Sequence, residues 1–80
     1  MELTIGEIIQ TTRKRIKMAN GRSMSREFLA HKINCTTQNI YRIEKGIGTP
    51  SYAMLSKLAQ ALNCELIIEF KPIKANENNS

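Results

Sequence analysis

The chain has 80 residues, of which 41% are hydrophobic, and it carries a net charge of +5. This length allows one small domain of marginal stability, and the longest apolar run, Leu66 to Ile68, is far too short to span a bilayer. Residues 1–64 hold ten Lys and Arg against four Glu, so the globular part is basic. A basic domain indicates a polyanionic partner, with nucleic acid the first candidate, although solubility alone is the simpler explanation.

The first predicted element is a helix that begins after Thr4. Thr4 to Glu7 read T-x-x-E, the capping-box pattern of a helix start. Asn20-Gly21 is a stop signal beyond its end. The residues that recur at the spacing of one helical face are Ile5, Ile8, Ile9, Thr12 and Ile16.

Two short helices with a tight turn between them are predicted next. Ser25 is a suitable N-cap for a helix through Ile33, and Thr36 for a helix through about Lys45. Asn34 tolerates the left-handed conformation that a tight turn requires. Such a pair forms a helix-turn-helix. The residues expected to face inward are Ala30, Ile33, Ile40 and Ile43.

A fourth helix is predicted after the loop "GIGTP". Pro50 stands where a helix can start, and Asn63 ends the helical pattern. The apolar residues at helical spacing are Leu55, Leu58, Ala59 and Leu62.

The segment "CELIIEFK" that follows alternates like a β-strand. One side carries Leu66, Ile68 and Phe70, which we predict to be dimerisation residues. A single strand needs a partner, and the chain offers no second candidate, so the same strand of a second copy is the simplest partner. The alternative is an irregular tail docked on its own domain. Pro72 ends the pairing, and residues 73–80 are expected to form a flexible tail.

The run "MSREFLAHKINCTTQNIYRIEKGIGTPSYAMLSKLAQALN" resembles the Cro and phage-repressor type of helix-turn-helix domain, the XRE family. The specific marks are "LA", "RIEKG", "TPS" and "KLAQAL", and "IGEIIQTTR" is similar to the family's first helix. The resemblance implies an all-α fold, a small bundle of four or five helices to which the C-terminal strand is appended. It also implies that the third helix enters the major groove of double-stranded DNA.

The resemblance further implies the DNA-binding residues. Gln38 suits adenine and Arg42 suits guanine, because each can form two hydrogen bonds with its base. Arg26 and Lys45 are expected to meet phosphates. The full set of expected DNA-binding residues is Arg26, Thr36, Thr37, Gln38, Asn39, Tyr41, Arg42 and Lys45.

Arg13 and Glu44 match a pair that forms a buried salt bridge in this family. The chain departs from the family pattern between Arg13 and Met24, where it is about six residues longer than usual. We therefore expect the first helix to continue to Met18 and Phe28 to pack against it.

No residue pattern indicates catalysis or a cofactor. Cys35 and Cys64 lie far apart with no other ligand at metal spacing, and His31 is the only histidine. No signal-peptide pattern is present, so we expect a cytoplasmic protein with reduced thiols that binds neither metal nor membrane and is not an enzyme.

These observations divide the chain into a DNA-binding domain (1–64), a dimerisation strand (65–72) and a tail (73–80). The first functional hypothesis is a homodimeric transcriptional repressor that reads a pseudo-palindromic site with residues 36–45 in the major groove. The second is an antitoxin whose main partner is a toxin protein.

Overall fold

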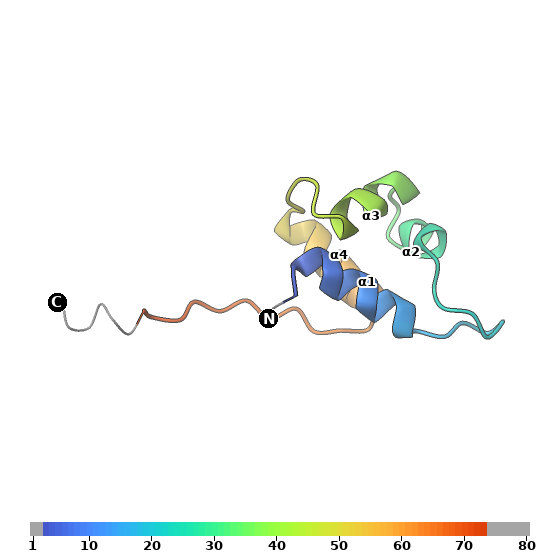
Figure 1. The fold of residues 1–80 in the computed structure, drawn as a ribbon, viewed down its shortest axis with the longest axis horizontal. Coiled ribbons are helices and arrows are strands. Elements are labelled where there is room, and N and C mark those ends of the chain that lie inside the picture. Colours follow the sequence, from blue (N-terminus) through green and yellow to red (C-terminus); the bar gives the residue numbers. More distant parts are fainter. Residues whose placement is uncertain (1–2, 74–80) are drawn as a thin grey trace.

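The computed structural model describes residues 3–73 and contains four helices within that range. Figure 1 shows α2 and α3 on the upper side of the bundle, α1 and α4 below them, and residues 64–73 leading away from the helices. This arrangement agrees with the expected all-α fold. The helices are α1 (Ile5–Arg15), α2 (Arg26–Lys32), α3 (Thr37–Glu44) and α4 (Tyr52–Ala61).

Every helix begins with a hydroxyl side chain that caps it. The capping oxygen accepts a hydrogen bond from the backbone N–H three residues later, at 3.0–3.1 Å. In α1 the Glu7 carboxylate also accepts from the backbone N–H of Thr4 at 2.9 Å, which completes a capping box. Each such cap stabilises its helix by about 1 kcal/mol. The N-caps are Thr4, Ser25, Thr36 and Ser51.

Left-handed residues end three of the helices. Asn34 follows α2 with φ 60°, Gly46 follows α3 with φ 79°, and Asn63 follows α4 with φ 59°. Asparagine and glycine tolerate this conformation better than other residues do. The turn after α2 is closed by a hydrogen bond from the Cys35 N–H to the Ala30 carbonyl at 2.9 Å, so α3 starts close to α2.

The core draws on all four helices and on the segment before α2. Leu29, Ile40 and Leu58 are fully buried. Burial of each such side chain contributes roughly 1.5–3 kcal/mol to the free energy of folding, so this small core stabilises the fold. The buried hydrophobic residues are Ile9, Met24, Leu29, Ala30, Ile33, Ile40, Ile43, Leu58 and Leu62.

The expectation that the first helix continues to Met18 is wrong. α1 ends at Arg15, and Ile16 is already extended, with φ −82° and ψ 119°. The chain then turns back on itself, because the Met18 N–H donates to Arg22 O at 2.8 Å and the Met24 N–H donates to Ile16 O at 2.9 Å. A small hairpin around Asn20-Gly21 therefore takes up backbone groups that a longer helix would have used.

Two smaller expectations also need correction. Phe28 cannot pack against a lengthened α1; it is partly exposed beside the hairpin, with the Lys32 ammonium 5.8 Å from its ring centroid. α4 begins at Tyr52 rather than at Pro50, because Ser51 provides the cap.

Residues 64–73 form neither helix nor strand in the single chain. Leu66 is half-buried, whereas Ile68 is 58% and Phe70 97% exposed. The strand and its pairing across a dimer stay predictions, because a lone chain supplies no second strand edge. Of the predicted tail, residues 74–80 lie outside the described range. No helix between residues 3 and 73 has the length and apolar character needed to cross a membrane.

Candidate nucleic-acid interface

The two faces of α3 differ sharply. Ile40, Ile43 and Glu44 are buried on the inner face. α3 itself lies at the upper edge of the bundle in Figure 1. Most of the DNA-binding residues expected in this segment are exposed, namely Thr36, Gln38, Tyr41, Arg42 and Lys45. Thr37 and Asn39 are half-buried. Seven of the eight expected residues therefore belong to α3 and its two caps, Thr36 and Lys45.

Glu44 attaches the inner face of α3 to α1 through an ion pair with Arg13. Its carboxylate accepts hydrogen bonds from Arg13 Nε at 2.7 Å and from Arg13 Nη2 at 3.1 Å, so the pair is bidentate. Arg13 Nη1 also donates to the Met24 carbonyl oxygen at 2.8 Å. The Glu44 side chain is fully buried and that of Arg13 is 7% exposed. This ion pair joins the end of α3 to α1 and to the segment before α2.

Arg26 completes the group, and sequence reasoning missed this contact. Its Nε donates to Glu44 Oε1 at 2.8 Å, so one carboxylate holds two guanidinium groups. The Arg26 guanidinium also lies 5.2 Å from the ring centroid of Tyr41, and the Lys45 ammonium lies 5.6 Å from the same ring. These are cation–π distances, so the Tyr41 ring has two cations near it, one from α2 and one from the C-cap of α3.

The two arginines keep Glu44 ionised. Burial raises the pKa of the Glu44 carboxyl, but the hydrogen bonds and positive charges of Arg13 and Arg26 together outweigh burial and lower that pKa below its ordinary value. The carboxylate therefore serves as a fixed negative charge that positions Arg26 next to the outer face of α3.

Arg26 stands apart from the other expected DNA-binding residues because it also has this internal role. Its side chain is 29% exposed and lies in a surface hollow with Thr37, Gln38 and Tyr41. Within residues 3–73 the hydrogen bond from Arg26 to Glu44 uses Nε, and its Nη groups donate no hydrogen bond to another carboxylate. Arg26 can therefore brace Tyr41 and still present a positive charge to a phosphate.

Gly6 is a structurally important residue that the sequence analysis overlooked. It is buried where α1 crosses the end of α3, and a Cβ built on it would lie 2.5 Å from the carbonyl oxygens of Ile43 and Glu44. Only glycine allows the two backbones to approach so closely. A glycine inside a helical pattern was the available signal, since it costs about 1 kcal/mol relative to alanine and usually has a packing reason.

The loop after α3 extends the same surface. Lys45 is the exposed C-cap of α3, and Gly46 and Gly48 both have positive φ, at 79° and 77°. A shallow hollow of about 290 Å³ lies between this loop and α3, with Asn39 and Arg42 in its lining. Exposed loop backbone beside a lysine suits phosphate contacts.

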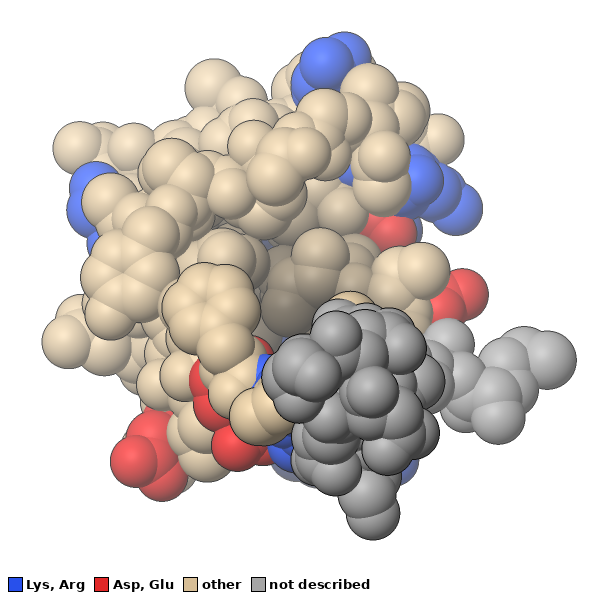
Figure 2. Space-filling view, turned by 90° about the vertical axis from the view of Figure 1, so that its left-hand side faces the viewer, with Lys and Arg blue, Asp and Glu red and all other residues tan. Residues whose placement is uncertain are grey.

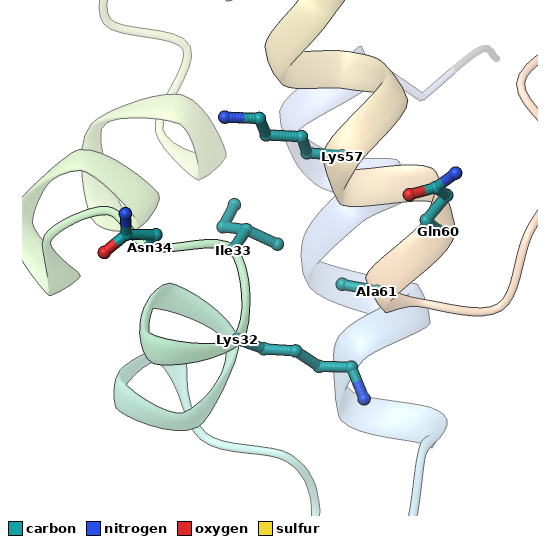
Figure 3. A pocket seen from close by; sticks show the side chains of 6 residues that line it. All are labelled: Lys32, Ile33, Asn34, Lys57, Gln60 and Ala61. Carbon is teal, nitrogen blue, oxygen red and sulfur yellow. The ribbon is translucent and has the colours of Figure 1, made fainter.

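A third hollow, of about 390 Å³, lies between the turn after α2 and the last turns of α4. Figure 3 shows Lys32 and Lys57 reaching into this space from different helices, with Ile33 and Ala61 between them. None of its six lining residues is an acid, a histidine or a cysteine. The hollow therefore adds positive charge to the surface. Within residues 3–73, no three His, Cys, Asp or Glu side chains lie close enough together to hold a metal ion.

The geometry of α3 suits the edges of base pairs. An α-helix fits the major groove, where amides and guanidinium groups distinguish bases by their donors and acceptors. The matching family model, described as Helix-turn-helix, covers residues 14–68 of this chain. The matched range is more than half of the chain and contains α2, the turn, α3 and α4.

Proposed function

Because the chain belongs to the helix-turn-helix family, of the Cro and phage-repressor type, we propose that it is a homodimeric repressor of transcription that reads a pseudo-palindromic DNA site. The family match makes it a DNA-binding domain of the kind found in transcription regulators. The dimer, the repressor role and the form of the site are the proposed parts.

The observation that carries the proposal is the outer face of α3. Gln38 and Arg42 are exposed there, while Ile40 and Ile43 on the other side hold the helix against the core. The amide of Gln38 can bond adenine and the guanidinium of Arg42 can bond guanine, each through two hydrogen bonds. Side chains of these types, on a helix that is anchored from behind, support base reading in the major groove.

Positive charge around α3 supports the non-specific part of binding. Arg26 lies beside the start of α3 and Lys45 at its end, with a basic excess over residues 1–64. Lysines and arginines on phosphates release counterions, so affinity is expected to fall steeply with salt. Phosphate contacts would set the register of the protein on the duplex, and α3 would choose the bases.

The experiment that tests the proposal is selection of binding sites from random duplex DNA with the purified full chain at a stated salt concentration. We expect a pseudo-palindrome whose half-sites lie about 34–36 Å apart, one helical turn, because each copy of α3 would enter successive major grooves. Enrichment of a single half-site would contradict the dimeric reading. Failure to enrich any sequence would contradict sequence-specific binding itself.

A second candidate function is that of an antitoxin whose main partner is a toxin protein. The observation that favours it is the exposed apolar side chains of Ile67, Ile68 and Phe70, which another protein could cover. Co-purification of a second protein with the chain, or a toxin-like reading frame beside its gene, would support this function. The two candidates are compatible, since an antitoxin can also repress its own operon.

We also propose that the protein acts in the cytoplasm and is not an enzyme. The buried carboxylate of Glu44 is held by two arginines and is unsuited to proton transfer, and His31 is exposed. The fixed state of the Glu44 carboxylate supports a binding role rather than catalysis.

A further inference from the structure

Apolar side chains gather on the side of the bundle away from α3. Ile5 and Ile8 of α1 are partly exposed there, next to a hollow of about 290 Å³ formed by α1, α4 and residues 64–67. Nearly all side chains that line this hollow are hydrophobic. Figure 2 shows the side from which residues 64–73 leave the bundle, where uncharged side chains cover most of the visible surface and both basic and acidic side chains lie mainly around them. This surface differs from the basic surface expected to meet DNA.

The C-terminal segment beside this hollow lacks backbone partners. The last backbone–backbone hydrogen bond is that from the Cys64 N–H to the Ala59 carbonyl, and residues 65–73 make none in the described chain. Their sequence alternates as a strand does, and a strand is stable only when its N–H and C=O groups pair with a second strand. An unpaired segment with a strand-like sequence next to an apolar hollow indicates an interaction surface.

We propose that the occupant of this surface is residues 65–71 of a second copy, paired antiparallel across a two-fold axis at Ile68. This inference rests on the dimer of the proposed function and specifies its interface. A second copy carries the same unpaired edge and the same apolar hollow, so one symmetric contact satisfies both chains. No other segment of residues 3–73 has an unpaired strand pattern that could serve instead.

Charge selects the register of this pairing. If the two-fold axis is normal to the two paired strands, it must pass between one residue and the same residue of the second copy. The reason is that directly opposite side chains lie on the same face of a sheet, whereas neighbouring residues of one strand lie on opposite faces. With Ile68 on the axis, Leu66 lies opposite Phe70 and Glu65 lies opposite Lys71. Opposite charges in directly facing positions stabilise a pair, and like charges destabilise it.

The neighbouring registers are electrostatically worse. With Ile67 on the axis, Glu65 would face Glu69. With Glu69 on the axis, that residue would face its own copy. Only the register centred on Ile68 places the three apolar residues of one face opposite one another and pairs unlike charges.

The exposure of Leu66 indicates which face of the paired strands would lie against the helical bundle. Leu66 and Ile67 both line the hollow, but Leu66 is half-buried there, whereas Ile67 is 72% exposed. Ile68 and Phe70 share the face of Leu66, since side chains alternate along a strand. Pairing would therefore cover both residues against the hollows of the two copies and leave both α3 helices free for DNA.

Disulfide trapping tests the register directly. In a chain with Cys35→Ser and Cys64→Ser, three single-cysteine variants are compared: Ile67→Cys, Ile68→Cys and Glu69→Cys. On the axis, the two Cα atoms lie about 4.5–5.5 Å apart, within the range for a disulfide. A cysteine one residue away from the axis is displaced by two residues along the strands from the same cysteine of the second copy. The two Cα atoms then lie about 8 Å apart and cannot be bridged by a disulfide without movement of the backbone.

We expect Ile68→Cys to form covalent dimers about tenfold faster than the other two under mild oxidation, as seen by non-reducing electrophoresis. Faster trapping of Ile67→Cys or Glu69→Cys would overturn the register. Absence of trapping in all three, or a monomer by sedimentation of the unmodified chain, would overturn the second copy as occupant.

A charge exchange supplies an independent readout. Glu65→Lys or Lys71→Glu alone puts like charges opposite each other twice per dimer and should weaken dimerisation about two- to thirtyfold at low salt. The double variant Glu65→Lys/Lys71→Glu should restore it. A double variant as weak as the singles would overturn the pairing.

Site selection on the same variants separates this inference from the proposed function. Trapping at Ile68 without any enriched DNA site would leave the interface supported and the DNA-reading role contradicted. Enrichment of a palindrome without trapping would support the role and overturn this interface.

Discussion

Gly6 lies against the end of α3 so closely that a Cβ on it would stand 2.5 Å from the carbonyl oxygen of Glu44. The same residue, Glu44, is bound through its side chain to Arg13 on α1 at 2.7 Å. α1 therefore holds the end of α3 twice, by a close backbone contact and by an ion pair two turns further along. The position of the proposed DNA-reading helix depends on both contacts.

Gly6→Ala is expected to destabilise the fold. The added methyl group would meet backbone rather than a flexible side chain, and such overpacking costs about 1–3 kcal/mol. Helix propensity alone predicts the opposite sign, since alanine in place of glycine within a helix gains about 0.5–1 kcal/mol. The free energy of unfolding from urea denaturation separates the two.

Lys14→Ala is the control for this prediction, because Lys14 is exposed on the same helix. Its free energy of unfolding should change by no more than about 0.5 kcal/mol. A Gly6→Ala variant more stable than the parent would show that α1 can move away from α3 without loss.

Glu44→Gln is expected to destabilise the protein by roughly 3–5 kcal/mol, because it removes the negative charge that two guanidinium groups share. Arg13 would bear most of this cost, since its side chain is far more buried than that of Arg26. Urea denaturation measures the loss, and a variant that fails to fold agrees with it. Glu27→Gln, the same change at an exposed position, should cost less than about 1 kcal/mol. Equal losses for the two variants would contradict the role of the ion pair.

Acid should remove the contribution of Glu44. The pKa of its carboxyl is lower in the folded chain than in the unfolded chain, where it is about 4.3, so the unfolded state binds the proton more readily. The stabilisation is thus present above that value and is lost as the pH falls through the lower, folded pKa. The free energy of unfolding measured below about pH 4.5 should fall more steeply in the parent than in Glu44→Gln. Parallel curves would contradict this assignment.

Gln38→Ala and Arg42→Ala are each expected to relax specificity at one base position of the half-site. A base contact through two hydrogen bonds is worth about 1–3 kcal/mol of discrimination, so the loss should appear on the preferred sequence and vanish on a sequence mutated at that position. Titration of both duplexes by each variant measures the difference. An equal loss of affinity for the two duplexes would show that the residue does not read a base.

Lys45→Ala is expected to behave differently. As a phosphate contact at the end of α3, Lys45 should contribute equally to all sequences, and its loss should reduce the slope of log affinity against log salt by about 1. The comparison uses the same two duplexes over a range of salt. An unchanged salt slope would place Lys45 away from the phosphates, with Tyr41 as its main contact.

Local patterns in the sequence were enough to predict most helix boundaries. The hydroxyl N-caps Thr4, Ser25 and Thr36 and the left-handed Asn34 act on backbone groups within a few residues, so their effect can be read without the rest of the chain. The prediction that the first helix continues to Met18 failed for the opposite reason. The hairpin that replaces the helix depends on pairing between backbone groups about eight residues apart, such as Met24 with Ile16.

The sequence by itself determined the helix-turn-helix and the polar outer face of α3, because helical period and capping are local properties. Only the tertiary structure decided that Arg26 shares Glu44 with Arg13, and that Gly6 lets α1 touch the end of α3. These contacts join residues 18 to 38 positions apart, and their geometry depends on how the helices cross. Packing across helices, rather than the composition of α3, determines how its outer face is held.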